Sequence, residues 1–326
     1  MAGRDDGGTA RAPERSPPTA PRRSGPEPGP GEGEAVTTLE PGRLQRRIAH
    51  ISDLHFGKED PEVVVGLMED LRQRRADLVL VSGDLTQRAL RLEFVAAGEY
   101  LRNLGIPWMA VPGNHDLPLH ARRVLRPFGD YRRHIHPDLM PRYMDDDVAV
   151  LGLTTASPLI WTQGFVTPRM LRVLRAWAAE AGDRLRIVIA HHPFSRPDEG
   201  GHPLVVNWRA AVRTMEMSGV DIVLTGHHHI SGRSESRAYA VDGPRRLVVV
   251  GAGTSTSVRQ RGELNSYNLL HYNGHRVYVE RRLWHEDRFV SAGLQRFTRL
   301  PHNGVADRRR SRPVRIRPPR RPAIRA

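Results

Sequence analysis

The chain has 326 residues, of which 39% are hydrophobic, and this is enough for a sizeable core in one large α/β domain or two small ones. It contains no cysteine, which excludes disulfides, thiolate metal sites and cysteine nucleophiles. The net charge is +14, but residues 301–326 alone carry nine Arg and one Asp. More than half of the excess charge therefore lies in an Arg/Pro-rich tail and says little about the partners of the rest of the chain.

The two ends of the chain differ in composition from the part between them. Residues 1–44 are rich in Pro and Gly, and residues 291–326 form the Arg/Pro-rich tail, so we expect both segments to be disordered. The folded domain is therefore predicted to span residues 45–290. No apolar run approaches the roughly 20 residues of a membrane helix. The first residues lack the apolar core of a secretory signal, so we expect a cytoplasmic protein without a membrane span.

Three apolar runs early in the domain end on residue types that bind metals. These runs, with the polar residues that follow them, are 47–52 before Asp53 and His55, 78–81 before Asp84, and 108–111 before Asn114, His115 and Asp116. Helices are predicted between them, over 61–75 and about 87–104. Asp53 precedes Asp84 by 31 positions, and Asp84 precedes Asn114 by 30. Each interval is the length of one βαβ unit, so the three strands should be parallel neighbours with their polar ends together.

Two later apolar runs end in the same way, on His191-His192 and on Gly226-His227-His228-His229. The elements predicted in this part are strands at 147–154, 185–190 and 221–224, and helices near 119–127, 168–181 and 207–218. Short strands at 237–240, 247–250, 267–270 and 276–281 follow, joined by Gly-rich turns, and are expected to extend a second sheet. The predicted fold class is α/β, a four-layer αββα sandwich of two mixed sheets flanked by helices.

Five apolar runs that each close on Asp, Asn or His are hard to explain by packing alone. A single Asp after a strand is more often a cap or turn residue, and a lone His is usually polar surface. The order and spacing of the five together nevertheless predict a binuclear metal site. Asp84, at the carboxyl end of its strand, is the candidate that both ions share. The available ligands are His, Asp and Asn, which suits two divalent ions of Mn, Fe or Zn.

These motifs, in this order over residues 46–285, resemble the calcineurin-like metallophosphoesterase family. The signature Ser82-Gly-Asp-Leu-Thr86 and the Gly-His-x-His ending are most similar to its bacterial branch, which contains class III cyclic-nucleotide phosphodiesterases. The resemblance implies that Asp84 bridges two ions. The other ligands that it implies are Asp53, His55 and His229 for one ion, and Asn114, His191 and His227 for the other.

The chemistry of such a centre agrees with these residue types. Two divalent ions about 3.5–4 Å apart repel each other, and a shared carboxylate such as Asp84 offsets this repulsion. A water that bridges the ions has its pKa lowered to roughly 7, and the resulting hydroxide would attack phosphorus in line with the leaving oxygen. Asn114 would add a neutral carbonyl ligand. The resemblance gives His115 the role of stabilising the transition state or protonating the leaving alkoxide, with Asp116 as the residue that orients it.

Other histidines near these motifs are weaker candidates. His192 adjoins a predicted ligand, and chain neighbours rarely reach the same ion, so we expect it to support a ligand or to contact the substrate. His202, in a Gly/Pro-rich loop, is a candidate substrate contact, although a solvated loop residue is the more common outcome. Asn114 is a further candidate for contact with the substrate, and the role of His228 is open.

The predicted function is a metal-dependent phosphoesterase that hydrolyses a small phosphodiester, and the subfamily resemblance favours a 3′,5′-cyclic nucleotide. The same centre would serve a pyrophosphatase acting on a nucleotide-sugar-lipid or a glycerophosphodiester hydrolase. A non-catalytic binding module is disfavoured because every ligand position and His115 are present. A nucleic-acid processing protein is a further alternative, since the basic tail would contact polyanions non-specifically. A solubilising tail is the simpler explanation, and the sequence leaves the oligomeric state open.

Overall fold

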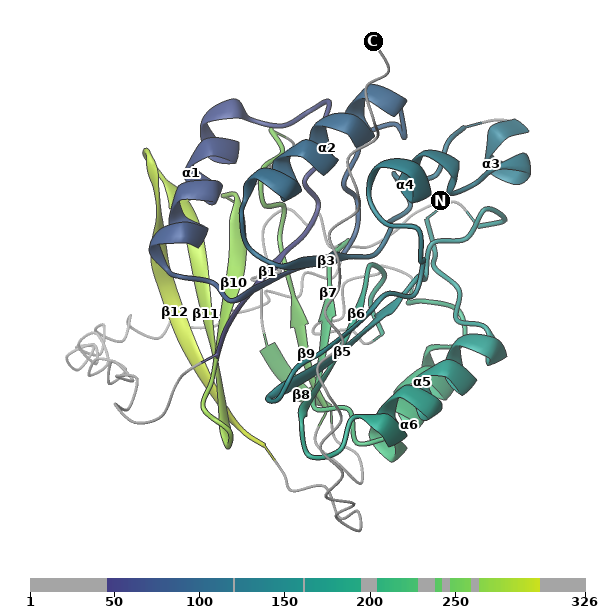
Figure 1. Ribbon diagram of the computed structural model, residues 1–326, viewed down its shortest axis with the longest axis vertical. Coiled ribbons are helices and arrows are strands. Elements are labelled where there is room, and N and C mark those ends of the chain that lie inside the picture. The colour runs from purple at the N-terminus through teal and green to yellow at the C-terminus, as the bar shows by residue number, and fades with distance from the viewer. Residues whose placement is uncertain are drawn as a thin grey trace, which may run out of the picture. The chain divides into compact units, whose positions relative to one another are not determined.

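The computed structural model describes residues 46–119, 121–160, 162–194, 204–227, 238–241, 247–258 and 264–299. These residues form two six-stranded mixed sheets that lie face to face, with helices on the outer side of each sheet (Figure 1). The predicted four-layer αββα arrangement is thereby confirmed.

The first sheet carries the strands that lead to Asp53, Asp84 and Asn114. Its strand order is β12-β11-β10-β1-β2-β3, in which β1, β2 and β3 are parallel and the other neighbours are antiparallel. Helices α1 (Pro61–Gln73) and α2 (Arg91–Asn103) make the two crossovers. The strands are β1 (Arg46–Ile51), β2 (Leu78–Val81), β3 (Trp108–Ala110), β10 (Ser266–Tyr272), β11 (Arg276–His285) and β12 (Arg288–Thr298).

The second sheet carries the strands that lead to His191 and His227. Its order is β4-β5-β6-β7-β9-β8, with β5, β6, β7 and β9 parallel. Its strands are β4 (Arg142–Met144), β5 (Val148–Leu153), β6 (Leu185–Ala190), β7 (Ile222–Thr225), β8 (Ala238–Val241) and β9 (Leu247–Gly251), and helices α5 (Pro168–Glu180) and α6 (Trp208–Met217) cover its outer face. The connection between the sheets contains α3 (Ala121–Leu125) and α4 (Gly129–His134).

Burial on both faces explains why the central strands are continuous apolar runs. In β2, Leu78 and Leu80 belong to the apolar layer between the two sheets, whereas Val79 and Val81 belong to the layer under the helices. A strand of a parallel sheet that is covered on both sides has no polar face, so its sequence does not alternate. The polar residues are displaced to the strand ends, where the candidate site lies.

One expectation about the sheets is wrong. The late strands were expected to extend the second sheet, and β8 and β9 do so, but β10, β11 and β12 extend the first sheet. β10 pairs antiparallel with β1, with Arg46 opposite Tyr272. β9 lies between β7 and β8, whereas β1 pairs with the parallel strand β2 on one side only, which leaves its other edge for β10. β12 continues past residue 290, where the sequence analysis places the end of the domain. The boundaries of the two terminal segments stay a prediction.

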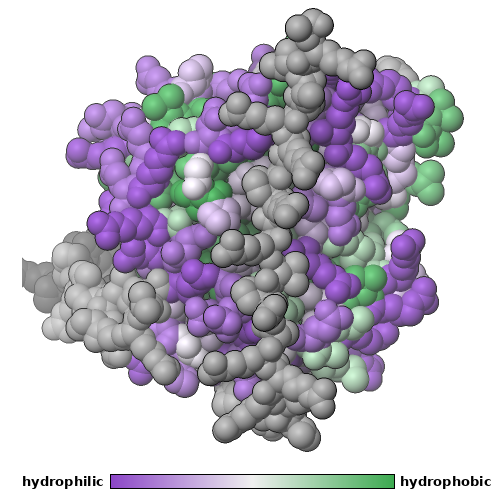
Figure 2. All heavy atoms as spheres, in the orientation of Figure 1, coloured by the Kyte–Doolittle hydropathy of each residue, from purple (hydrophilic) through white to green (hydrophobic). Residues whose placement is uncertain are grey.

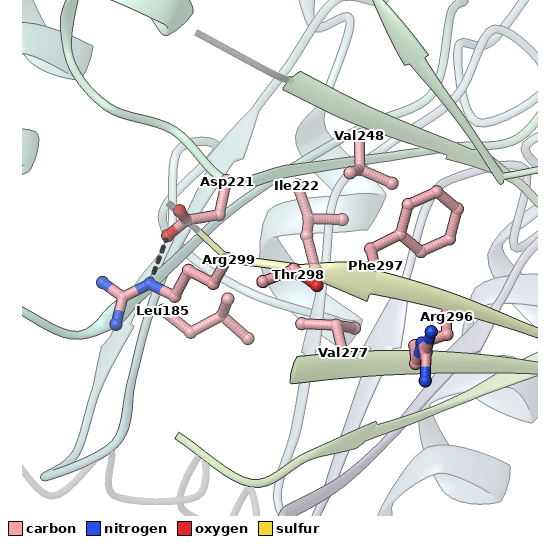
Figure 3. Close-up of a pocket in the computed structure, with 9 residues that line it drawn as sticks. All are labelled: Leu185, Asp221, Ile222, Val248, Val277, Arg296, Phe297, Thr298 and Arg299. Atoms are coloured by element: carbon pink, nitrogen blue, oxygen red, sulfur yellow. Dashed lines mark hydrogen bonds and ion pairs between the residues drawn. The ribbon is translucent and has the colours of Figure 1, made fainter. Parts of the chain in front are cut away.

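A cavity of about 160 Å³ lies between the two sheets, away from the candidate site (Figure 3). Its lining includes Leu185 and Ile222, the first residues of β6 and β7, and therefore marks the amino ends of the parallel strands. Arg299 closes it from one side through an ion pair with Asp221, with 3.3 Å between Nε and Oδ2. The predicted ligands follow the opposite, carboxyl ends of these strands.

The surface agrees with the charge-rich sequence. Figure 2 shows a face on which hydrophilic residues predominate and hydrophobic ones occur in small groups. None of the helices in the described ranges combines the length and the hydropathy that a membrane crossing requires. The location of the protein in the cell stays a prediction.

Candidate metal centre

The loops after β1 and β2 continue the parallel pairing of their strands. The amide of Asp53 donates to the Gly83 carbonyl and the amide of His55 donates to the Asp84 carbonyl, each at 3.0 Å. Asp53, His55 and Asp84 have φ angles of 53°, 48° and 50°, in the left-handed region that side chains rarely adopt. Such backbone conformations cost on the order of 1–3 kcal/mol each and concentrate at functional sites. Here they turn three ligand-type side chains toward one point.

Glycines in the motifs allow this close approach. A Cβ on Gly113 would lie 2.1 Å from Asp84 Oδ1, and a Cβ on Gly226 would lie 1.9 Å from Ser52 Oγ and 2.6 Å from Asp53 Oδ2. No side chain fits at either position without displacing a carboxylate. The Gly-Asn-His and Gly-His motifs therefore contain glycine for a packing reason that is local to the site.

Acceptor atoms converge around Asp84 and His191. His191 donates Nδ1–H to the Ser82 carbonyl at 2.8 Å, so the neutral ring keeps its lone pair on Nε2. That Nε2 lies 3.3 Å from Asp84 Oδ2, 3.1 Å from Asn114 Oδ1 and 3.1 Å from His227 Nδ1. Asp84 Oδ2 is buried and accepts no hydrogen bond within the described ranges. A cation or a proton must lie among these atoms, because buried acceptors that face one another repel.

A second group of ligand types borders the same oxygen of Asp84. His55 Nε2 is 3.7 Å from Asp53 Oδ1 and 3.8 Å from Asp84 Oδ2. Asp53 Oδ2 is held by the Ser52 hydroxyl at 2.5 Å and by the amide of His227 at 3.1 Å. Asp84 therefore borders both groups, as the predicted bridging role requires.

Charges in the site compensate one another. Burial alone would raise the pKa of Asp84, but the charge of the His191 imidazolium, with smaller effects of His115 and His55, lowers it below its ordinary value. Burial alone would lower the pKa of His191, but Asp84 and Asp53 raise it to about 9. A proton on His191 thus offsets the carboxylates where a bound cation would do so instead. This donor set of carboxylates, imidazoles and one amide fits divalent Mn, Fe or Zn.

His115 lies beside the second group, and one of its ring nitrogens is within 4.8 Å of ligand atoms of His55 and Asp84. Its ring is edge-on to that of His55, with centroids 4.9 Å apart, and its amide donates to Asp84 Oδ1 at 2.9 Å. Nδ1–H donates to the Gln87 carbonyl at 2.8 Å, which leaves Nε2 as the nitrogen that exchanges a proton. His115, Asn114 and His227 are half-buried, whereas the carboxylates beneath them are buried.

Asp116 contacts the loops and not the His115 ring. Its carboxylate accepts from the amides of Leu85, Thr86 and Gly113 and from the Thr86 hydroxyl, at 2.8–3.2 Å. Burial, together with repulsion from Asp84, raises its pKa to about 6. The Gln87 carbonyl, and not Asp116, therefore orients the His115 ring. The expected contact between Asp116 and the ring is absent from the described contacts, and Asp116 instead holds two loops together. A main-chain acceptor such as Gln87 O leaves no signal in the sequence.

Of the remaining histidines that the sequence singled out, the structure describes His192 but not the others. His192 is buried beside His191 and His227, with ring centroids 4.9 Å and 4.8 Å away, so a chain neighbour of a ligand does reach the same place. Thr155 holds its Nδ1, and nothing in the sequence pointed to Thr155. The predicted site residues outside the described ranges are His202 and His229, and so is His228, whose role was left open. The ligand assignments stay predictions.

The fold and the site define a class of proteins, metal-dependent phosphoesterases built on two stacked mixed sheets. A comparison with known families agrees: the profile of the calcineurin-like phosphoesterase family matches residues 46–231, more than half of the chain. The protein belongs to this family, and the resemblance predicted from the motifs is confirmed.

Curated relatives carry names from within this class. The chain is 33% identical over 159 residues to a glycerophosphodiester phosphodiesterase of Enterobacter lignolyticus, covering 45% of this chain and 56% of that protein. It is 24% identical over 252 residues to a probable cyclic nucleotide phosphodiesterase of Pseudoalteromonas sp., covering 74% and 93%. It is 26% identical over 225 residues to a UDP-2,3-diacylglucosamine hydrolase of Salmonella dublin, covering 62% and 89%. The chain spans about half the length of the first of these relatives.

Solved structures support the fold alone, because their sequence identities are low. PhoD superposes with a TM-score of 0.58 at 10% identity, covering 81% of this chain and 73% of that one. A purple acid phosphatase from yellow lupin seeds superposes with a TM-score of 0.52 at 12% identity, covering 79% and 54%.

Proposed function

We propose that the protein is a phosphodiesterase that uses two divalent ions. The observation that carries this proposal is the convergence of acceptor atoms around Asp84 and His191, because such a cluster is stable only when positive charge lies within it. When bound, the two ions supply Lewis-acid chemistry, activating water and withdrawing charge from the phosphoryl group. Asp53, His55 and His229 would hold one ion, Asn114, His191 and His227 the other, and Asp84 both.

The arrangement of the protein's own residues suggests how a phosphodiester would be oriented in the site. The buried carboxylates lie at the floor of the site, and the half-buried Asn114 and His115 lie toward solvent. A phosphodiester entering from that side would have its leaving oxygen near His115. In its protonated form, His115 would donate Nε2–H to that oxygen, since Nδ1–H is engaged by the Gln87 carbonyl. An alkoxide needs such a proton more than an aryloxide does.

A small phosphodiester is the favoured substrate class, and a 3′,5′-cyclic nucleotide comes first within it. Support comes from the similarity to the probable cyclic nucleotide phosphodiesterase of Pseudoalteromonas sp., which extends over 93% of that relative. A glycerophosphodiester is an alternative, supported by the higher identity over a shorter stretch to the Enterobacter lignolyticus protein.

A second candidate is an amphiphilic substrate, such as a nucleotide-sugar-lipid pyrophosphate. Two segments that begin at the site expose apolar side chains. Leu125 of α3 is 79% exposed, and Leu159, in the loop that follows Thr155, is 82% exposed. Arg123 joins the two segments by donating to the carbonyls of Ser157, Pro158 and Ile160. Exposed apolar groups on segments that follow site residues in the chain would suit a ligand with an acyl chain.

The experiment measures hydrolysis of bis-p-nitrophenyl phosphate, p-nitrophenyl phosphate, cyclic AMP and a lipid-linked pyrophosphate by chelated and by Mn-reloaded protein. Asp84→Ala is the control. Diester cleavage that requires the metal and vanishes in the variant supports the proposal, and the rate on cyclic AMP tests the favoured substrate. Turnover of the lipid substrate alone would favour the amphiphilic candidate. Absence of bound metal from purified and reloaded protein would overturn the proposal.

The Arg/Pro-rich tail is proposed to make at most non-specific contacts with polyanions. Residues 301–326 lie outside the described ranges, and their composition predicts binding that weakens steeply with salt. Deleting this segment separates the two roles: retained hydrolysis with lost retention on DNA would assign the contact to the tail, whereas lost hydrolysis would give the tail a part in the reaction.

A further inference from the structure

The buried histidine next to the predicted ligand His191 has one ring nitrogen fixed by a threonine. His192 is 2% exposed and Thr155 is 0% exposed. Thr155 Oγ1 lies 2.8 Å from His192 Nδ1 and accepts the main-chain N–H of the same histidine at 3.2 Å. A buried hydroxyl has one proton, which needs an acceptor. Whether His192 Nδ1 is that acceptor determines which ring nitrogen carries the imidazole proton.

The balance of donors and acceptors places that proton on Nε2. If Thr155 donates its hydroxyl proton to His192 Nδ1, the hydroxyl both donates and accepts, and the imidazole proton is on Nε2. In the alternative, Nδ1–H would donate to Thr155, and the hydroxyl proton would have no acceptor in the described part of the chain. A buried donor without a partner costs about 1–3 kcal/mol, which favours the first arrangement. His191 shows the opposite pattern, because a carbonyl can only accept from its Nδ1.

His192 Nε2 is buried and has no hydrogen-bond partner within the described ranges. The ring lies among those of His191 and His227, with centroids 4.9 Å and 4.8 Å away. Gly164 packs against its other side, where a Cβ would lie 2.5 Å from ring atoms. The ring is therefore held in place, and it brings an unused donor to a site whose other groups are mostly acceptors.

We propose that His192 is not a metal ligand and that it donates Nε2–H to a phosphoryl oxygen of the substrate, on the side of the site formed by His191 and His227. Ligand atoms of His191, His192 and His227 lie within 4.8 Å of one another, and the ligand set that the resemblance implies takes His191 and His227. This leaves the Nε2–H of His192, which has no partner within the described ranges, for a phosphoryl oxygen. This inference rests on the proposed phosphodiesterase function. His192 would then act on the substrate, with Thr155 as the positioning residue that sets its tautomer.

The tautomer is measured directly by ¹⁵N NMR of the Zn-loaded protein, with the His192 signals identified by their absence from His192→Asn. We expect an unprotonated Nδ1 and a protonated Nε2 for His192, and the reverse for His191. Thr155→Val removes the hydroxyl at nearly constant volume, so the preference for Nε2–H should weaken in that variant. A protonated Nδ1 on His192 in the wild-type protein would overturn the proposal, whether or not the protein has phosphodiesterase activity.

Binding of inorganic phosphate to the metal-loaded protein tests the contact without a known substrate. In His192→Gln the amide nitrogen replaces Nε2, whereas in His192→Asn it replaces Nδ1 and no donor reaches the substrate side. We expect phosphate affinity within about threefold of wild type for the Gln variant and a loss on the order of 10- to 100-fold for the Asn variant. Both variants should bind as many ions as the wild type. Loss of an ion in both, or unchanged phosphate affinity in the Asn variant, would overturn the proposal.

Discussion

At the scale of single residues, neighbouring polar groups of the site have different surroundings and therefore different tasks. Asp84 borders two groups of ligand types, whereas Asp116 accepts hydrogen bonds from two loops. His115 is oriented by a main-chain carbonyl and presents Nε2. These contacts separate the residues that bear on the substrate from those that hold the loops.

His115→Gln and Asp116→Asn are expected to have opposite signatures. The rate of His115→Gln on an alkyl diester should fall by about 10²–10⁴-fold and its rate on bis-p-nitrophenyl phosphate far less, because p-nitrophenolate leaves without a proton. Asp116→Asn places an amide NH₂ against N–H donors and should lower the free energy of unfolding by about 1–3 kcal/mol in urea titrations, without a dependence on leaving group.

The control for both variants is His136→Gln, at a histidine whose side chain hydrogen-bonds to the main chain of Asp138. It should change neither the rate nor the stability. A dependence on leaving group in Asp116→Asn would contradict the assignment of His115 to the Gln87 carbonyl.

The strand-end residues could be predicted from the sequence, but their partners could not. Asp53, Asp84 and Asn114 follow buried apolar runs at βαβ intervals, so topology alone brings them together. The role of Asp116 depends on main-chain amides of another loop, and that of His192 depends on a threonine 37 positions away. Neither contact follows from residue type or spacing, because any residue can supply an amide and a lone Thr carries no signal.

At the scale of elements, a buried ionic cluster fastens α1 to β11. Arg282 forms two hydrogen bonds with Asp70, from Nε at 2.6 Å and from Nη2 at 2.9 Å, and a third with Glu280 at 2.8 Å. Tyr267 donates its hydroxyl to Asp70 at 2.5 Å. Removing one partner of such a buried pair leaves an uncompensated charge, which typically costs about 3–5 kcal/mol. The cluster lies in the layer under α1, where Tyr267 pairs with Arg282, and it contributes none of the predicted ligands, so we assign it to the fold.

Glu280 makes the stability of this cluster depend on pH. Burial opposes its ionisation, but hydrogen bonds from His271, Ser291 and Arg282 outweigh burial and lower its pKa from 4.5 to about 2. A carboxylate with a lowered pKa in the folded state stabilises the protein above its unfolded pKa, and this contribution is lost as the pH falls through the folded value. Glu280→Gln should therefore be less stable than wild type at neutral pH, and the difference should shrink between about pH 4.5 and pH 2. Urea unfolding across this range measures it, with exposed Glu69→Gln as the control that should follow the wild type.

β12 is an edge strand of the first sheet, and the residue that follows it contacts both sheets. The side chain of Arg299, just after β12, contacts Asp221 and the Arg184 carbonyl of the second sheet and Tyr272 of the first. A chain that ends after residue 300 should keep the thermal midpoint of the full chain, whereas one that ends after residue 290 loses most of β12 and should unfold at a much lower temperature. Equal midpoints in circular dichroism would contradict this role of β12. The sequence could not place the strand, because its residues alternate weakly and continue into an Arg-rich segment.

At the scale of the whole domain, the proposed metal site joins the two sheets at one end. Asp53, Asp84 and Asn114 follow strands of the first sheet, and His191 and His227 follow strands of the second. At the opposite end, Arg299 makes contacts with both sheets. Ions at the first end would therefore stabilise the packing of one sheet on the other, in addition to any part in chemistry.

Removal of the ions should destabilise the protein in a pH-dependent way. Saturation at 100 times the dissociation constant contributes about 2.7 kcal/mol to the free energy of unfolding. In the absence of a cation the pKa of His191 is raised to about 9. Below that pH an ion must displace the proton of His191 in order to bind. Stabilisation by Mn should therefore grow from about pH 6 to pH 9. Urea unfolding with Mn and with chelator measures this difference. A difference that is independent of pH would contradict the displacement of the His191 proton.

The central claim is that Asp84 is shared by two divalent ions, and anomalous diffraction from crystals of the Mn-loaded protein tests it most directly. The account predicts two peaks about 3.5–4 Å apart, one beside Asp53 and His55 and the other beside Asn114, His191 and His227, each with an oxygen of Asp84 as a ligand. In crystals of Asp84→Asn, at least one of the two peaks should be lost. A single peak in the wild type, or two peaks of which only one contacts Asp84, would contradict the account.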